Sequence, residues 1–188
     1  MNRKLLVGLI RWVAGAVCLV ASSVLHATLL YSVSLDTSPL IGHSAAPFYL
    51  EFQLNDGGGN VNNTAMLGNF DFGGGSASGS PVLSGGASGS LTSVVVITDS
   101  DFFNEFYEGF TPGSTLRFLL ELTANAESPA PDQFSFAILC GMDSPLPEIP
   151  TESVSDVFVE IDIDSKSPTV RTYAGDGIAI AGISPHSG

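Results

Sequence analysis

Hydrophobic and polar residues alternate along most of the chain after residue 28, which is the pattern of β-strands that bury one face. In segment 48–54 four apolar residues alternate with three others (Phe48, Leu50, Phe52 and Leu54 against Tyr49, Glu51 and Gln53). The same period recurs at 29–35, 66–72, 91–97, 116–122, 134–138 and 157–163, with shorter candidates at 168–174 and 177–183. Gly, Pro, Asn and Asp separate these segments. The pattern predicts an all-β, antiparallel β-sandwich, most simply of the jelly-roll type.

Segment 102–110, within DFFNEFYEGF, fits two periods. Phe102, Phe106 and Phe110 have strand spacing, whereas the addition of Phe103 and Tyr107 gives helical spacing. Aromatic residues favour strands, and the Thr-Pro-Gly that follows favours a turn into another strand. We therefore expect a strand here, with a helix as the alternative.

A Gly-Ser-Ala tract, FDFGGGSASGSPVLSGGASGS, fills residues 70–90. A linker between domains would need a stable domain on each side, but residues 28–69 are too few to form a sandwich without disulfides. The tract is therefore expected to supply loops, and at most one strand of small residues, within a single β-sandwich domain at 28–188.

The N-terminus has the pattern of a secretory signal peptide. The basic opening MNRKLLVGLIR is followed by an uncharged run at 12–25 and small residues, which predicts a signal at 1–27 with cleavage after Ala27. An uncleaved membrane anchor is the alternative, but it needs roughly 20 apolar residues, and Arg11 interrupts the run. Cleavage would leave Cys140 as the one cysteine, in a position that predicts a buried apolar role.

The charge of the expected mature chain limits its partners. It has three basic residues against all 19 acidic ones, a net charge of −16. Such a surface repels nucleic-acid phosphates and anionic lipid headgroups, so we expect no nucleic-acid partner and no membrane association after cleavage. Calcium ions, neutral polysaccharide or other matrix components remain compatible with this charge.

Long stretches of the chain resemble a family of exported bacterial PEP-CTERM proteins. They include TLLYSVSLDTSPLIGHSAAPFYLEFQLNDG, NNTAMLGNFDFGGGSASGSP, TDSDFFNEFYEGFTPGSTLRF and PDQFSFAIL. The resemblance implies export to the cell surface or extracellular matrix of bacteria that make exopolysaccharide, and it supplies no active-site residue. The family's proteins usually end in a Pro-Glu-Pro motif, an apolar span and a basic tail, whereas this sequence ends in ISPHSG. This difference suggests truncation or release without the sorting step.

Two functional hypotheses follow. The first is a non-catalytic structural or adhesive component of the surface matrix. The second is a carbohydrate-binding module, in which exposed aromatic residues would stack on sugar rings (Tyr49, Tyr107, Phe158 and Tyr173). For Phe158 the alternative is a second covered face of its sheet.

The sequence offers little for catalysis. The G-x-S-x-G spacing of a nucleophile elbow has Ala77 at its centre, so the nucleophile is missing. Glu160, Asp162 and Asp164 alternate on one sheet face, and a second acidic group lies at 99–108, but a glycosidase needs two carboxyl groups at a defined separation. We expect a solvated acidic face rather than an enzyme, with glycoside hydrolysis as the least favoured function.

One loop is a candidate calcium site. It contains clustered oxygen donors (Asn55, Asp56, Asn60, Asn62 and Asn63) of the type that Ca²⁺ prefers. The spacing of an EF-hand is absent, and Asn with Gly is also ordinary turn chemistry. Calcium is the one cofactor that the sequence suggests.

Overall fold

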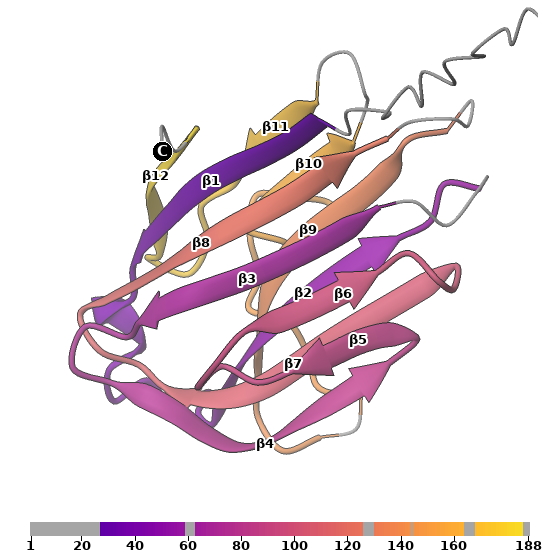
Figure 1. Cartoon of the computed structure of the whole chain (residues 1–188). Coiled ribbons are helices and arrows are strands. Elements are labelled where there is room, and N and C mark those ends of the chain that lie inside the picture. The colour runs from indigo at the N-terminus through magenta and orange to yellow at the C-terminus, as the bar shows by residue number, and fades with distance from the viewer. Residues whose placement is uncertain (1–26, 59–62, 126–129, 144, 164–167, 186–188) are drawn as a thin grey trace, which may run out of the picture.

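A computed structural model describes residues 27–58, 63–125, 130–143, 145–163 and 168–185. These residues form two antiparallel six-stranded sheets packed face to face, as Figure 1 shows, with one 3-10 helix, η1, at Ser38–Leu40. The strands are β1 Ala27–Asp36, β2 Phe48–Asn55, β3 Thr64–Asp71, β4 Ser76–Ser84, β5 Gly86–Gly89, β6 Val95–Thr98, β7 Phe103–Thr111, β8 Thr115–Ala124, β9 Asp132–Cys140, β10 Val159–Ile163, β11 Thr169–Thr172 and β12 Ala179–Pro185. The expectation of an all-β antiparallel sandwich is confirmed.

The order of strands explains why most of the pairings are long-range. The first sheet has the order β12-β1-β8-β3-β6-β5, and the second has the order β11-β10-β9-β2-β7-β4. The chain crosses between the sheets after β1, β2 and β3, so that most neighbours within a sheet come from distant parts of the sequence; β5-β6, β9-β10 and β10-β11 are pairs of consecutive strands. The neighbours β1-β8-β3-β6 in one sheet and β2-β7-β4 in the other are those of a jelly roll.

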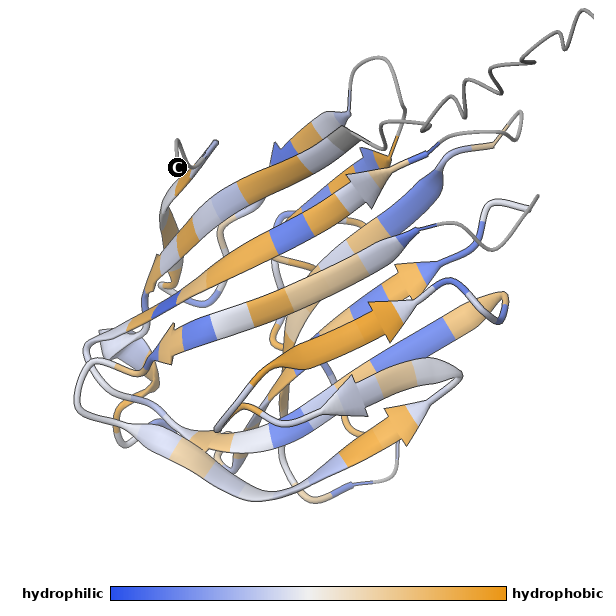
Figure 2. Ribbon diagram, in the orientation of Figure 1, coloured by the Kyte–Doolittle hydropathy of each residue, from blue (hydrophilic) through white to orange (hydrophobic). Residues whose placement is uncertain are grey.

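Side chains from the two inner faces form the hydrophobic core. Hydrophobic and hydrophilic bands alternate along strands such as β8 in Figure 2, as expected for strands with one buried face. Phe52 lies at the centre, with its ring centroid 5.2 Å from that of Phe136 and 5.4 Å from that of Phe118 on the opposite sheet. The alternation seen in the sequence is therefore the alternation between core and surface.

The ambiguous aromatic segment is a strand, as predicted. β7 covers residues 103–111 and pairs with β2 on one side and β4 on the other. Phe106 and Phe110 are buried in the core, whereas Phe102 precedes the strand and is 79 % exposed. Pairing on both sides and the burial of alternate residues favour the strand over a helix that would bury only one stripe.

The Gly-Ser tract forms two strands, β4 and β5, rather than the single one expected. β4 is an edge of the second sheet and β5 is an edge of the first, and they lie side by side in Figure 1. Gly85 joins them with a backbone φ of 58°, a conformation that favours glycine. At the start of the tract, a Cβ atom on Gly75 would clash with the carbonyl oxygen of Thr111. The small residues thus let the backbones approach closely at both ends of β4.

The predicted signal peptide lies almost entirely outside the described residues, which begin at Ala27. Within the described part of the chain there is no helix long and apolar enough to span a membrane.

Candidate functional site

A groove of about 720 Å³ lies on the outer face of the second sheet. The central strands β2 and β7 supply its floor, and the segment that follows β9 supplies one wall. Its lining combines aromatic, aliphatic, amide and carboxyl groups (Tyr49, Glu51, Gln53, Val82, Phe103, Glu105, Tyr107, Leu139, Asp143, Pro145, Leu146 and Glu148). A concave surface with apolar rings and a few convergent polar groups is the usual form of a small-molecule or glycan site.

Strand register places the floor residues next to one another. Tyr49, Glu51 and Gln53 alternate with core residues along β2, so all three face outward. Glu51 lies directly opposite Tyr107 on β7, and Gln53 lies opposite Glu105. Two side chains of β2 and two of β7, more than 50 positions apart in the sequence, therefore meet on one patch of the sheet.

Tyr49 and Tyr107 form an edge-to-face aromatic pair in this groove. Their ring centroids are 6.2 Å apart and their planes meet at 87°. Both rings are partly exposed, and both line the groove. Both residues thus offer aromatic carbon surface with a polar hydroxyl group at its edge to a molecule in the groove.

Glu51 is the most perturbed carboxyl group of the groove. It is 5 % exposed, and burial together with hydrogen bonding to the Glu105 side chain raises its pKa from 4.5 to about 8. The Gln53 Nε2 atom donates a hydrogen bond to Glu51 Oε1 at 3.0 Å, which acts in the opposite direction on this pKa. At neutral pH the Glu51 carboxyl group is therefore mostly protonated.

Two further acidic residues, Asp143 and Glu148, stand on the wall of the groove. Glu148 lies beside Leu139 through an isolated β-bridge, and its charge contributes to the raised pKa of Glu51. None of the described residues that line the groove is basic. The groove thus has a negative potential with no cation of its own in the lining.

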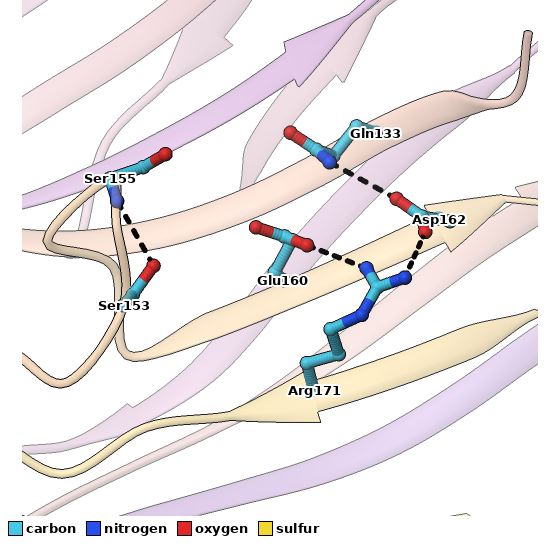
Figure 3. A network of polar contacts seen from close by, with 6 residues as sticks. All are labelled: Gln133, Ser153, Ser155, Glu160, Asp162 and Arg171. Carbon is cyan, nitrogen blue, oxygen red and sulfur yellow. Dashed lines mark hydrogen bonds and ion pairs between the residues drawn. The ribbon is translucent and has the colours of Figure 1, made fainter.

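A polar row extends from the groove across the whole sheet. Register pairs place one residue from each strand in line, from the β4 edge to the β11 edge (Ser84, Glu105, Gln53, Ser135, Glu160 and Arg171). At the far end, Arg171 Nη1 contacts Glu160 Oε1 at 2.6 Å and Arg171 Nη2 contacts Asp162 Oδ2 at 2.7 Å. Figure 3 shows this fork, with Gln133 donating a hydrogen bond to Asp162 at 3.0 Å.

The acidic face predicted on β10 is therefore neutralised in part rather than simply solvated. The Arg171 guanidinium hydrogen-bonds to Asp162 and lowers the pKa of that carboxyl group. Glu160 shares the same guanidinium, and Asp164 lies outside the described residues. At this end of the row, one guanidinium offsets one of the two carboxylate charges of Glu160 and Asp162, whereas none of the described residues that line the groove is basic.

The expectation that Phe158 contacts sugar is wrong. Phe158 is fully buried, at 0 % exposure, and its ring lies 6.1 Å from that of Phe136. It precedes β10, just after a turn in which Asp156 has a φ of 51°, so strand alternation does not set its direction. The alternative of a covered side chain is the observed one.

Tyr173 is separated from the other tyrosines. It follows β11 at the edge of the sheet, where its backbone N–H donates a hydrogen bond to the carbonyl oxygen of Phe158 at 3.0 Å. Tyr173 is not among the groove-lining residues. Two of the four aromatic candidates, Tyr49 and Tyr107, are thus brought together.

The acidic segment 99–108 does not form one cluster. Asp99 is buried and accepts a hydrogen bond from the backbone N–H of Asn63 at 2.9 Å. Glu105 faces the groove, whereas Glu108 points inward and its Oε2 atom accepts a hydrogen bond from the Leu91 N–H at 2.7 Å. Of this segment, Glu105 alone contributes a carboxyl group to the candidate site.

The candidate calcium residues divide into three groups. Asn60 and Asn62 lie outside the described residues. Asp56 Oδ1 accepts a hydrogen bond from the Gly58 N–H at 2.7 Å, and Asn55 ends β2. In the described part of the chain, no group of three or more His, Cys, Asp or Glu residues could hold a metal ion, but this set consists mostly of Asn. A calcium ion here stays a prediction.

Asn63 has a structural role that the sequence did not reveal. Its Nδ2 atom donates hydrogen bonds to Asp132 Oδ2 at 2.6 Å and to the Asn125 carbonyl oxygen at 3.0 Å. Its Oδ1 atom accepts a hydrogen bond from the Asn125 N–H at 2.9 Å. This buried amide joins the start of β3 to both ends of the loop between β8 and β9.

Sequence reasoning did not identify Glu51, Gln53 and Glu148 as site residues. The signal that could have found Glu51 and Gln53 is their alternation with core residues beside Tyr49, which marks one outward face. The pairing of β2 with β7, which adds Glu105 and Tyr107 to that face, is set by the fold. Glu148 lies in an irregular segment with no periodic signal.

Comparison of the chain with protein-family models, with curated proteins and with solved structures gave no significant match. The assignment of function therefore depends on the chemistry of the groove.

Proposed function

We propose that the protein is an exported, non-catalytic component of a bacterial surface matrix that binds polysaccharide in the groove on its second sheet. The observation that supports this function best is the Tyr49–Tyr107 pair, whose perpendicular rings line a groove together with carboxyl and amide groups. Sugar rings have an apolar face and a rim of hydroxyl groups, so they match aromatic rings flanked by hydrogen-bonding groups.

The polar groups beside the tyrosines suit hydroxyl recognition. Gln53 offers both a donor and an acceptor, and the carboxyl groups of Glu51 and Glu105 accept hydrogen bonds from hydroxyl groups. These residues come from two hydrogen-bonded strands in the middle of the sheet, so their positions are fixed before a ligand arrives. Preorganisation of this kind favours a binding surface.

Hydrolysis is less well supported. The Glu51 and Glu105 carboxyl groups hydrogen-bond to each other, so they stand closer than the roughly 5–10 Å that glycosidases keep between their two catalytic carboxyl groups. We therefore propose binding without cleavage. Release of reducing ends from a bound glycan would contradict this part of the proposal.

Export follows from the same proposal. Cleavage of residues 1–27 and passage to the cell surface would bring the groove into contact with exopolysaccharide. Expression of the full chain in a Gram-negative host, followed by N-terminal sequencing of the mature protein, should give Thr28 as the first residue. An intact N-terminus on a protein retained in the cytoplasm would contradict export.

Binding can be tested with tyrosine variants of the exported protein on a glycan array and in polysaccharide pull-downs. We expect retention on at least one polysaccharide, with Tyr107→Ala and Tyr49→Ala each weakening binding by about tenfold or more because a stacking ring is lost. Tyr107→Phe keeps the ring and should retain most of the affinity.

Tyr173→Ala is the matched control, because Tyr173 is an equally large, partly exposed aromatic residue outside the groove. It should leave binding unchanged. Equal loss in Tyr173→Ala and Tyr107→Ala, or no retention on any glycan, would contradict binding in the groove and leave the structural role alone.

A further inference from the structure

The charge of the groove sets a preference among the glycans that its aromatic pair could accept. Four carboxyl groups line it, from Glu51, Glu105, Asp143 and Glu148, and none of the described lining residues is basic. Arg171, the cation at the far end of the same sheet face, is occupied by Glu160 and Asp162 at 2.6 and 2.7 Å. The groove therefore offers uncompensated negative charge next to two tyrosine rings.

The Glu51–Glu105 pair is the focus of this charge. Glu51 is almost completely buried, yet its neighbours are a carboxyl group and an amide rather than a lysine or arginine. A buried carboxyl group beside a second carboxyl group, with no cation next to it, is held in its protonated form. An ammonium group placed beside Glu51 and Glu105 would supply the missing positive charge, so that Glu51 ionises and releases its proton to solvent.

We propose that the groove selects glycans by charge, and that the Glu51–Glu105 pair receives the protonated amine of an amino sugar. This inference rests on the proposed glycan-binding function and names the class of glycan. An ammonium group has three N–H donors, enough to contact both carboxyl groups, while the sugar ring that carries it lies against Tyr49 or Tyr107. Neutral sugars would bind more weakly, and uronic acids would be repelled.

Because of the two tyrosines, the proposed binding of an amino sugar differs from the general attraction of cations to an acidic protein. A free cation would gain only the charge interaction, which salt screens, whereas an amino sugar also gains ring contact in the groove. The preference should therefore depend on two specific carboxyl groups and not on the net charge of the molecule.

The test compares oligomers of glucosamine and of N-acetylglucosamine of equal length, which differ in whether the amine is free or acylated. Affinities are measured by calorimetry on the exported protein at pH 6, where the free amine is protonated. We expect the glucosamine oligomer to bind about tenfold more tightly, and a galacturonate oligomer not to bind. Raising the salt concentration should reduce the ratio between the first two.

The double variant Glu51→Gln, Glu105→Gln keeps the size and hydrogen-bonding capacity of the pair but removes its charge. It should bind the two oligomers equally. The control variant Asp36→Asn, Glu121→Gln removes two carboxyl groups from the first sheet, away from the groove, and should keep the tenfold ratio. Circular dichroism and thermal unfolding would verify that both double variants are folded.

The possible outcomes distinguish a failure of charge selection from a failure of glycan binding itself. If neither oligomer, nor any other glycan, binds, the proposed function fails. If both bind equally well, or the acylated one binds better, glycan binding stands and charge selection is overturned. An equal fall of the ratio in the two double variants would assign the preference to net charge, which also overturns the role of the Glu51–Glu105 pair.

Discussion

At the scale of single residues, Glu51 links the chemistry of the groove to the stability of the fold. Because the folded protein raises its pKa from 4.5 to about 8, the folded state holds a proton that the unfolded state has lost over this range. The free energy of unfolding therefore falls as the pH rises from 4.5 to 8, by at most about 1.4 kcal/mol per pH unit. Burial of a carboxyl group beside another one thus has a measurable cost at neutral pH.

Glu51→Gln removes this titration and should therefore reduce the dependence of the free energy of unfolding on pH. Urea unfolding at pH 5, 6.5 and 8 is expected to show the wild type losing stability relative to the variant as the pH rises. Glu121→Gln, on the first sheet, should leave the slope of the wild type intact. Parallel curves for wild type and Glu51→Gln would mean that Glu51 titrates normally in the folded protein.

Arg171 gives the opposite pH dependence. Its guanidinium lowers the pKa of Asp162, so the pair stabilises the fold above the ordinary pKa of Asp and loses that effect as the pH falls through the lowered value. Arg171→Gln should raise the pKa of Asp162 toward its usual value in an NMR titration. Because the guanidinium is partly exposed and solvent screens the pair, the loss of stability at pH 7 should be small.

Arg117→Gln is the control for this prediction. Arg117 makes a more exposed pair with Asp71, at 3.5 Å, on the first sheet, and its loss should leave the pKa of Asp162 unchanged. An unchanged Asp162 pKa in Arg171→Gln would show that the fork of Figure 3 does not persist in solution.

The alternation around Tyr49 was sufficient to predict which residues of β2 face outward, but not which residues lie beside them. Glu51 meets Tyr107 because β2 pairs with β7, and nothing local in either segment encodes that pairing. Phe158 was assigned to an outer face because alternation was extended one residue beyond its strand, into a turn. Local periodicity thus predicts faces, whereas neighbours on a face require the topology.

At the scale of secondary structure, the strands with apolar periodicity were predictable and the Gly-Ser tract was not. Segments such as 48–54 and 116–122 have enough large residues to mark their buried face. Residues 76–84 and 86–89 form β4 and β5 with few such residues, so their alternation carries little signal. These two strands lie where neighbouring backbones approach closely, and small residues fit there.

Gly75→Ala tests this account of the tract. The added Cβ atom would overlap the carbonyl oxygen of Thr111, so the β4 end of the tract must move, and we expect a loss of about 2 kcal/mol in the free energy of unfolding. Gly182→Ala, in β12, adds a Cβ atom into open space and should change the stability by less than about 0.5 kcal/mol. Equal effects in chemical denaturation would contradict a packing role for Gly75.

At the scale of the whole molecule, most of the negative charge has no basic residue beside it in the described part of the fold. The chain has a formal net charge of −13, and the described arginines form ion pairs with only three carboxylates: Asp71, Glu160 and Asp162. The remaining acidic residues repel one another more strongly in the compact state than in the expanded unfolded chain. This repulsion opposes folding and is long-range, so salt should weaken it.

We therefore expect salt to stabilise the protein. Raising sodium chloride from 10 to about 150 mM shortens the Debye length from roughly 30 Å to 8 Å, which screens repulsion between distant carboxylates more than attraction within the short Arg171 pairs. The midpoint of thermal unfolding at pH 7 should rise, and the rise should shrink near pH 4.2, where the sequence has no net charge. A fall in the midpoint with added salt at pH 7 would mean that the few ion pairs outweigh the repulsion. It would then be the local networks, and not the overall charge, that govern how this sandwich responds to its ionic surroundings.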